Sequence, residues 1–126
     1  MFDREIYFKL LEIIDELSEK AESGAVILVE GRKDREALME IGINGEIVEI
    51  SQKSISSVFD SFMGREVVVL TDWDEKGKRL EENLRRVLQN ADFSLRKELM
   101  KVVGKWTTRV EDLPAILKLF ERNIKI

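Results

Sequence analysis

The sequence predicts an α/β fold in which a mostly parallel sheet of about four strands is covered by helices on both faces. Two short runs, AVILVE and EVVVLT, are apolar enough to be strands that are buried on both sides, as strands of parallel sheets are. Between and after these runs, apolar residues recur at the 3.6-residue spacing of amphipathic helices. This alternation of strand and helix indicates the parallel sheet.

The elements follow from the same patterns, taken in order along the chain. Residues 3–22 carry one apolar stripe and are followed by Gly24, which predicts an extra amphipathic helix ahead of the core. The expected elements after it are strand 25–30, helix 34–42, strand 45–50, helix 54–64, strand 66–71, helix 75–90 and helix 94–105. The end of the chain predicts a short last strand over 106–111 and a terminal helix within 110–123, with Asp112 as its N-cap and Pro114 in its first turn.

The length of 126 residues fits a single domain. Within it we distinguish an N-terminal helix, residues 1–23, that packs on a core formed by residues 24–126. The longest apolar run, residues 25–29, is too short to cross a bilayer, and the charged N-terminus is unlike a secretory signal. We therefore expect a cytoplasmic protein without membrane association.

The composition limits the chemistry that the chain can perform. There is no cysteine and no histidine, which excludes disulfides, thiolate zinc sites and imidazole acid-base catalysis. Any metal ion must therefore be held by oxygen atoms. The net charge of −4 argues against a general polyanion binder, although five bases and one acid lie between Arg96 and Arg109. That segment is either a local basic face or an ordinary solvated surface.

Acidic residues follow the two most apolar strands. Glu30 ends the first strand in VEGRKD, and Asp72 and Asp74 follow the second in LTDWDEKG. In open parallel sheets, ligands lie beyond the carboxyl ends of the strands, so these acids meet in one crevice if the strands are neighbours. Clustered carboxylates repel one another unless a cation lies between them, and Mg²⁺ prefers such oxygen ligands together with substrate phosphates. The pattern predicts a Mg²⁺ site, with Mn²⁺ as the alternative ion.

Residues around these acids are candidates for supporting the site or contacting a phosphate. They are glycines that let backbone approach closely, lysines near in sequence, and one further acid: Gly31, Lys33, Asp34, Lys76, Gly77 and Lys78. Competing interpretations exist. Asp72 and Asp74 can serve as caps of the next helix, Asp34 suits an N-cap, and Trp73 either stacks on a nucleobase or packs against a loop.

VEGRKD, followed about forty residues later by LTDWDEKG, resembles the Toprim domain of bacterial-type primases, topoisomerases, OLD-family nucleases and the ribonuclease that matures 5S ribosomal RNA. The resemblance covers residues 24–112 and is closest to small stand-alone Toprim proteins and to the Toprim half of that ribonuclease. It implies a compact Rossmann-like fold in which Glu30 is the general acid or base and Asp72 and Asp74 coordinate Mg²⁺. Glu111, in TTRVED, resembles a segment of the ribonuclease-like members less specifically. Trp73 departs from the small residue or proline of many relatives.

The resemblance implies Mg²⁺-dependent phosphodiester chemistry on RNA or DNA, as a nuclease or a nucleotidyl transferase, and so favours an enzyme. The only tyrosine, Tyr7, lies on the N-terminal helix, and there is no zinc module, so the chain by itself is neither a topoisomerase nor a primase. Two alternatives stay open. One is a non-catalytic nucleic-acid-binding module that uses the Arg96 to Arg109 segment, and the other is a receiver-like switch phosphorylated on Asp72. The sequence also leaves open a homodimer or a protein partner.

Overall fold

The computed structural model describes residues 4–52 and 54–124, and its centre is a parallel sheet with the strand order β2-β1-β3. The strands are β1 (Val26–Val29), β2 (Glu46–Glu49) and β3 (Val67–Leu70), and β1 pairs in parallel with both of the others. The predicted α/β class and parallel pairing are confirmed. The described residues form three named strands rather than about four.

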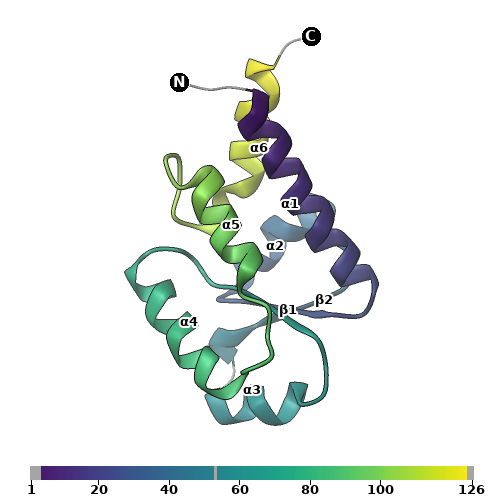
Figure 1. Cartoon of the computed structure of the whole chain (residues 1–126), viewed down its shortest axis with the longest axis vertical. Coiled ribbons are helices and arrows are strands. Elements are labelled where there is room, and N and C mark those ends of the chain that lie inside the picture. The colour runs from purple at the N-terminus through teal and green to yellow at the C-terminus, as the bar shows by residue number, and fades with distance from the viewer. Residues whose placement is uncertain (1–3, 53, 125–126) are drawn as a thin grey trace.

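Helices cover both faces of this sheet (Figure 1). They are α1 (Arg4–Glu22), α2 (Arg32–Glu40), α3 (Ile55–Phe62), α4 (Glu75–Val87), α5 (Ser94–Val103) and α6 (Leu113–Asn123), with short 3₁₀ turns η1 (Ile50–Gln52) and η2 (Val110–Asp112). Each of these α-helices agrees in position with a predicted helix. Residue 3, the predicted first residue of the first helix, lies outside the described range. Figure 1 shows α3 and α4 on one side of the sheet and α1, α2, α5 and α6 on the other.

The central strand explains why its sequence is apolar without interruption. Ile27 and Val29 point into a cluster formed with α1, α2, α5 and α6, whereas Val26 and Leu28 point into a second cluster formed with α3 and α4. Successive side chains of a strand face opposite sides of the sheet, so both faces of β1 need apolar residues. All four side chains are fully buried.

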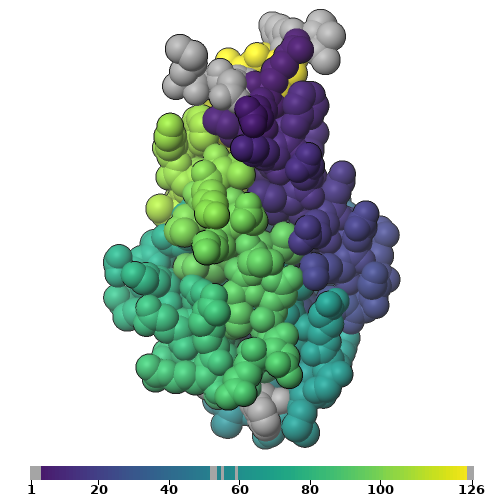
Figure 2. Space-filling view, in the orientation of Figure 1, coloured from purple at the N-terminus to yellow at the C-terminus, as the bar shows by residue number. Residues whose placement is uncertain are grey.

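The N-terminal helix is part of the larger cluster. Leu10 and Leu17 of α1 are buried in it, and α1 lies along α5. In the space-filling view, α1, α5 and α4 form much of this face of the molecule (Figure 2). In the described part of the chain, no helix combines the length and the apolar character that crossing a bilayer would require.

The prediction of a last strand over residues 106–111 is wrong. The segment is a turn that leads into η2, and its backbone forms single hydrogen bonds with residues that follow β3, without a ladder. The amide of Trp73 donates a hydrogen bond to the carbonyl of Thr108 at 2.9 Å, and the amide of Val110 donates one to the carboxylate of Asp72 at 2.9 Å. At the free edge of β3, an isolated parallel bridge between Val68 and Asp92 stands where a further strand would pair.

Candidate metal centre

The two acidic motifs meet at one edge of the sheet because β1 and β3 are neighbours in register. Val29 pairs with Leu70, so Glu30 and the residues after β3 leave the sheet side by side. Glu30, Asp72 and Asp74 each offer one carboxylate oxygen, and these oxygens lie within 4.8 Å of one another. The structure therefore brings together the three acids that the sequence places at strand ends.

A backbone amide holds each of the three carboxylates. The amide of Asp72 donates to Glu30 Oε2 at 2.7 Å, that of Val110 to Asp72 Oδ1 at 2.9 Å, and that of Gly77 to Asp74 Oδ1 at 2.8 Å. Within the described residues, no hydrogen bond or ion pair reaches the second oxygen of any of them. Each side chain is thus oriented through one oxygen and keeps the other for a ligand.

The electrostatics of the crevice favour a cation. The pKa of Asp72 is raised to about 7, chiefly by burial and also by the nearby carboxylates of Glu30, Asp34 and Asp74, against the lowering effect of the hydrogen bond from Val110. Burial also raises the pKa of Asp34. Both shifts have the same physical cause: carboxyl groups that are partly removed from water and that face other acids.

Two arginines beside the crevice form ion pairs with acids outside the group of three. Arg96 pairs with Glu81 at 2.6 Å, and Arg109 pairs with Glu111 at 3.0 Å. The three carboxylates consist only of hard oxygen donors, which suits Mg²⁺ or Mn²⁺, and two or three protein ligands leave coordination positions for water and a phosphate oxygen. The residues present therefore fit a divalent ion.

Asp74 combines the two interpretations that the sequence allows. It is the N-cap of α4 and accepts a hydrogen bond from the amide of Gly77 through Oδ1, and it also belongs to the group of three converging acids. Asp72 is not a cap of α4, because its partner is the amide of Val110 in a distant segment. Capping and metal binding are therefore compatible at this edge.

Asp34 is not the N-cap of α2, which is the role that the sequence suggested for it. Gly31 is the N-cap of α2, and Asp34 lies three residues later with its carboxylate accepting the amide of Gly31 at 3.1 Å. A glycine has no side chain with which to cap a helix, so the acid of the first turn reaches back instead. Asp34 is buried and lies outside the group of three acids.

The two glycines of the motifs differ in their surroundings. A Cβ added to Gly77 would clash with the carbonyl oxygen of Asp72, whereas one added to Gly31 would meet nothing within 4 Å. Gly77 is therefore required by the packing of the chain on itself. Exposed lysines lie on the first turns of α2 and α4: Lys33, Lys76 and Lys78.

Trp73 and Glu111 lie beside the crevice. The indole of Trp73 is 8% exposed and donates from Nε1 to the carbonyl of Thr107 at 2.7 Å, so it packs against a loop and offers no face to a nucleobase. Glu111 lies on η2, next to the Val110 amide that holds Asp72, and is paired with Arg109. It does not belong to the group of three acids.

Arg96 and Glu81 are buried charged residues near the crevice that the sequence patterns did not single out as functional. Arg96 is 5% exposed, so it is not part of a basic surface. The signal was present in its spacing, because Arg96 shares a helix face with the buried residues Leu99 and Val103. Glu81 has the same relationship to Leu84 on α4.

Comparisons with known proteins place the chain among archaeal and bacterial relatives. No protein-family model matches it. It is 37% identical over 115 residues to a UPF0292 protein of Archaeoglobus fulgidus, covering 88% of this chain and 91% of the relative. A solved structure, a putative protein from Aquifex aeolicus, is 32% identical with a TM-score of 0.68, covering 82% of this chain and 96% of that one. A small TOPRIM domain protein from Bacillus stearothermophilus is 24% identical with a TM-score of 0.49, covering 71% of this chain and 92% of that one.

Proposed function

The chain belongs to the UPF0292 protein family, and we propose that it is a Mg²⁺-dependent enzyme that acts on phosphodiester bonds of nucleic acid. The reaction is cleavage or nucleotidyl transfer on RNA or DNA. One observation carries this proposal: the carboxylates of Glu30, Asp72 and Asp74 converge within 4.8 Å, each held by a backbone amide through one oxygen. Three oriented acids with free oxygens are suited to a metal ion and to proton transfer.

The residues divide the work according to their positions. Asp72 and Asp74 follow β3 and would hold the ion through the oxygens that their amide contacts leave free. When bound, the ion would neutralise charge that develops on a phosphoryl oxygen. Glu30 follows the neighbouring strand β1 and would take or deliver the proton of the reacting oxygen.

The surroundings of the crevice suit a phosphate backbone. Lys33 lies in the first turn of α2, and Lys76 and Lys78 lie in the first turn of α4, all exposed to solvent. Helix N-termini and exposed lysines both attract phosphate groups. We assign these lysines to substrate binding and not to the ion.

The two alternative functions have less support. In the basic segment, Arg96 is buried and Arg109 forms ion pairs with neighbouring acids. The remaining bases are exposed lysines: Lys97, Lys101 and Lys105. A receiver-like switch needs a second acid after the first strand, and Gly31 stands there. Neither alternative uses the convergence of all three carboxylates.

The test is a cleavage assay on labelled single-stranded RNA and DNA with Mg²⁺ or Mn²⁺. We expect Glu30→Gln and Asp72→Asn each to lower the rate by at least about 100-fold. Glu82→Gln, which removes one charge from the exposed side of α4, is the matched control and should retain the rate. Cleavage that survives both substitutions would refute the assigned roles.

A further inference from the structure

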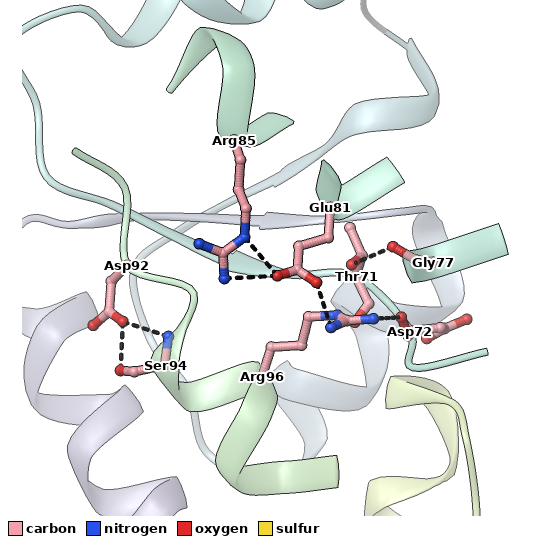
Figure 3. A network of polar contacts seen from close by, with 8 residues as sticks. All are labelled: Thr71, Asp72, Gly77, Glu81, Arg85, Asp92, Ser94 and Arg96. Atoms are coloured by element: carbon pink, nitrogen blue, oxygen red, sulfur yellow. Dashed lines mark hydrogen bonds and ion pairs between the residues drawn. The ribbon is translucent and has the colours of Figure 1, made fainter. Parts of the chain in front are cut away.

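A buried arginine from a different part of the chain holds the loop that carries Asp72. Arg96 lies in the first turn of α5, and its guanidinium reaches the end of β3 (Figure 3). Its Nε donates to the carbonyl of Thr71 at 3.1 Å, and its Nη2 donates to the carbonyl of Asp72 at 2.8 Å. Because β3 ends at Leu70, neither carbonyl lies within the strand itself.

The contacts of Arg96 and those of the crevice lie at opposite ends of the same peptide units. In a trans peptide, the carbonyl and the following amide point in opposite directions. The unit between Thr71 and Asp72 is held by Arg96 at its carbonyl and by Glu30 at its amide, at 2.7 Å. In the unit between Asp72 and Trp73, the Asp72 carbonyl accepts a hydrogen bond from Arg96, and the Trp73 amide donates one to the carbonyl of Thr108.

We propose that Arg96 is a positioning residue for the metal centre, which fixes the two peptide units on either side of Asp72 and thereby the direction of its carboxylate. This inference rests on the proposed function. If the unit between Thr71 and Asp72 rotated, the Asp72 amide would leave Glu30, and rotation of either unit would change the direction of the Asp72 side chain. One side chain therefore sets the relative placement of two of the three acids.

The guanidinium is itself held in place and neutralised. Its Nη1 donates to Glu81 Oε2 at 2.6 Å, and Glu81 Oε1 accepts from Arg85 Nε at 2.9 Å. Arg85 in turn lies over the ring of Phe93, 4.2 Å from its centroid. A planar fork of donors can serve two carbonyls and a carboxylate at once, which the single ammonium group of lysine cannot do in the same geometry.

The test compares Arg96→Met with Arg85→Met. Both variants remove an ion pair with Glu81, but only Arg96 contacts the carbonyls of Thr71 and Asp72. We expect the dissociation constant for Mn²⁺, measured by calorimetry, to rise at least about tenfold in Arg96→Met and to stay within about twofold of the wild-type value in Arg85→Met.

A second readout needs no metal. In the metal-free protein, hydrogen exchange followed by NMR should be at least about tenfold faster at the amides of Asp72 and Trp73 in Arg96→Met, while the buried Leu84 amide changes little. Should Arg96→Met not fold, Arg96→Lys replaces it, since it keeps the positive charge beside Glu81 and loses the fork. We expect the same changes in that variant, with smaller size.

The outcomes separate this inference from the proposed function. If the wild type binds no Mn²⁺, the proposed function fails, and the exchange rates still decide whether Arg96 orders the loop. If the wild type binds Mn²⁺ and the Arg96 variants bind it equally well while melting at lower temperature, Arg96 is only structural and the inference is overturned.

Discussion

The amide of Asp72 donates a 2.7 Å hydrogen bond to the carboxylate of Glu30, across 42 residues of sequence. This bond joins the ends of two neighbouring parallel strands at the point where the acids converge. It makes the position of Glu30 depend on the peptide unit before Asp72. Substitutions at either residue should therefore distinguish effects on the position of the Glu30 carboxylate from effects on its chemical role.

The first prediction concerns Glu30. Glu30→Gln retains an oxygen that can accept the Asp72 amide, whereas Glu30→Ala leaves that amide without its partner. We expect Glu30→Ala to be less stable than Glu30→Gln by about 1 to 3 kcal/mol in free energy of unfolding, measured with denaturant. Equal stability of the two variants would show that the hydrogen bond does not hold this side chain.

The second prediction concerns pH. Burial raises the pKa of Asp72 to about 7 in the folded chain, above the value of about 3.9 expected when unfolded. The unfolded chain releases this proton first, so without metal the free energy of unfolding falls as pH rises from about 4 and levels off above about 7. Asp72→Asn removes this loss. At pH 8 in EDTA we therefore expect the free energy of unfolding of the variant to exceed that of the wild type by about 1 to 2 kcal/mol. If the difference in free energy of unfolding between the two proteins were the same at pH 4 and at pH 8, the raised pKa of Asp72 would be contradicted.

The third prediction concerns Gly77. A Cβ at this position meets the carbonyl of Asp72, so Gly77→Ala should displace the loop and lower the free energy of unfolding by about 1 to 3 kcal/mol. Gly31→Ala is the matched control, because its Cβ enters open space and the extended backbone there accepts any residue. Thermal melting of both variants checks this. Similar losses in the two would mean that the close approach at Gly77 is not limiting.

The fourth prediction concerns Trp73. Trp73→Phe removes the hydrogen bond from Nε1 to Thr107 and should lower the free energy of unfolding by about 1 kcal/mol. Because the indole is buried, affinity for a single-stranded oligonucleotide should not change. Fluorescence anisotropy with a labelled oligonucleotide measures this affinity. A large loss of affinity in a folded Trp73→Phe variant would restore the base-stacking hypothesis.

Local patterns were sufficient for most of the fold. The apolar run around Ile27 and Leu28 predicted a strand buried on both faces, and the structure confirms it. The convergence of Glu30 with Asp72 also followed, since it needs only adjacent parallel strands. These features depend on residues close in sequence or on general rules of sheet topology.

The errors arose where long-range contacts decide the local structure. Residues 106–111 suit a strand by composition, but their backbone groups bind Asp72 and Trp73, which no local pattern indicates. Arg96 was grouped with surface bases by its charge, although its spacing from Leu99 places it on the buried face of α5. Helical spacing was the better guide there, because a buried base with partners is compatible with an apolar face.

The central claim is that Glu30, Asp72 and Asp74 form a divalent-metal centre. The most direct test is a calorimetric titration of Mg²⁺ and Mn²⁺ into the wild type and the Asp72→Asn, Asp74→Asn double variant, with and without a short single-stranded oligonucleotide. The Asp15→Asn, Asp60→Asn double variant makes the same change in charge at exposed positions and serves as the control.

We predict that the wild type and the control bind the ions, more tightly with the oligonucleotide present, and that the Asp72→Asn, Asp74→Asn variant does not. Equal binding by all three proteins at millimolar metal, or none by the wild type, would contradict the claim and leave the two aspartates as structural anchors of the loop and of α4.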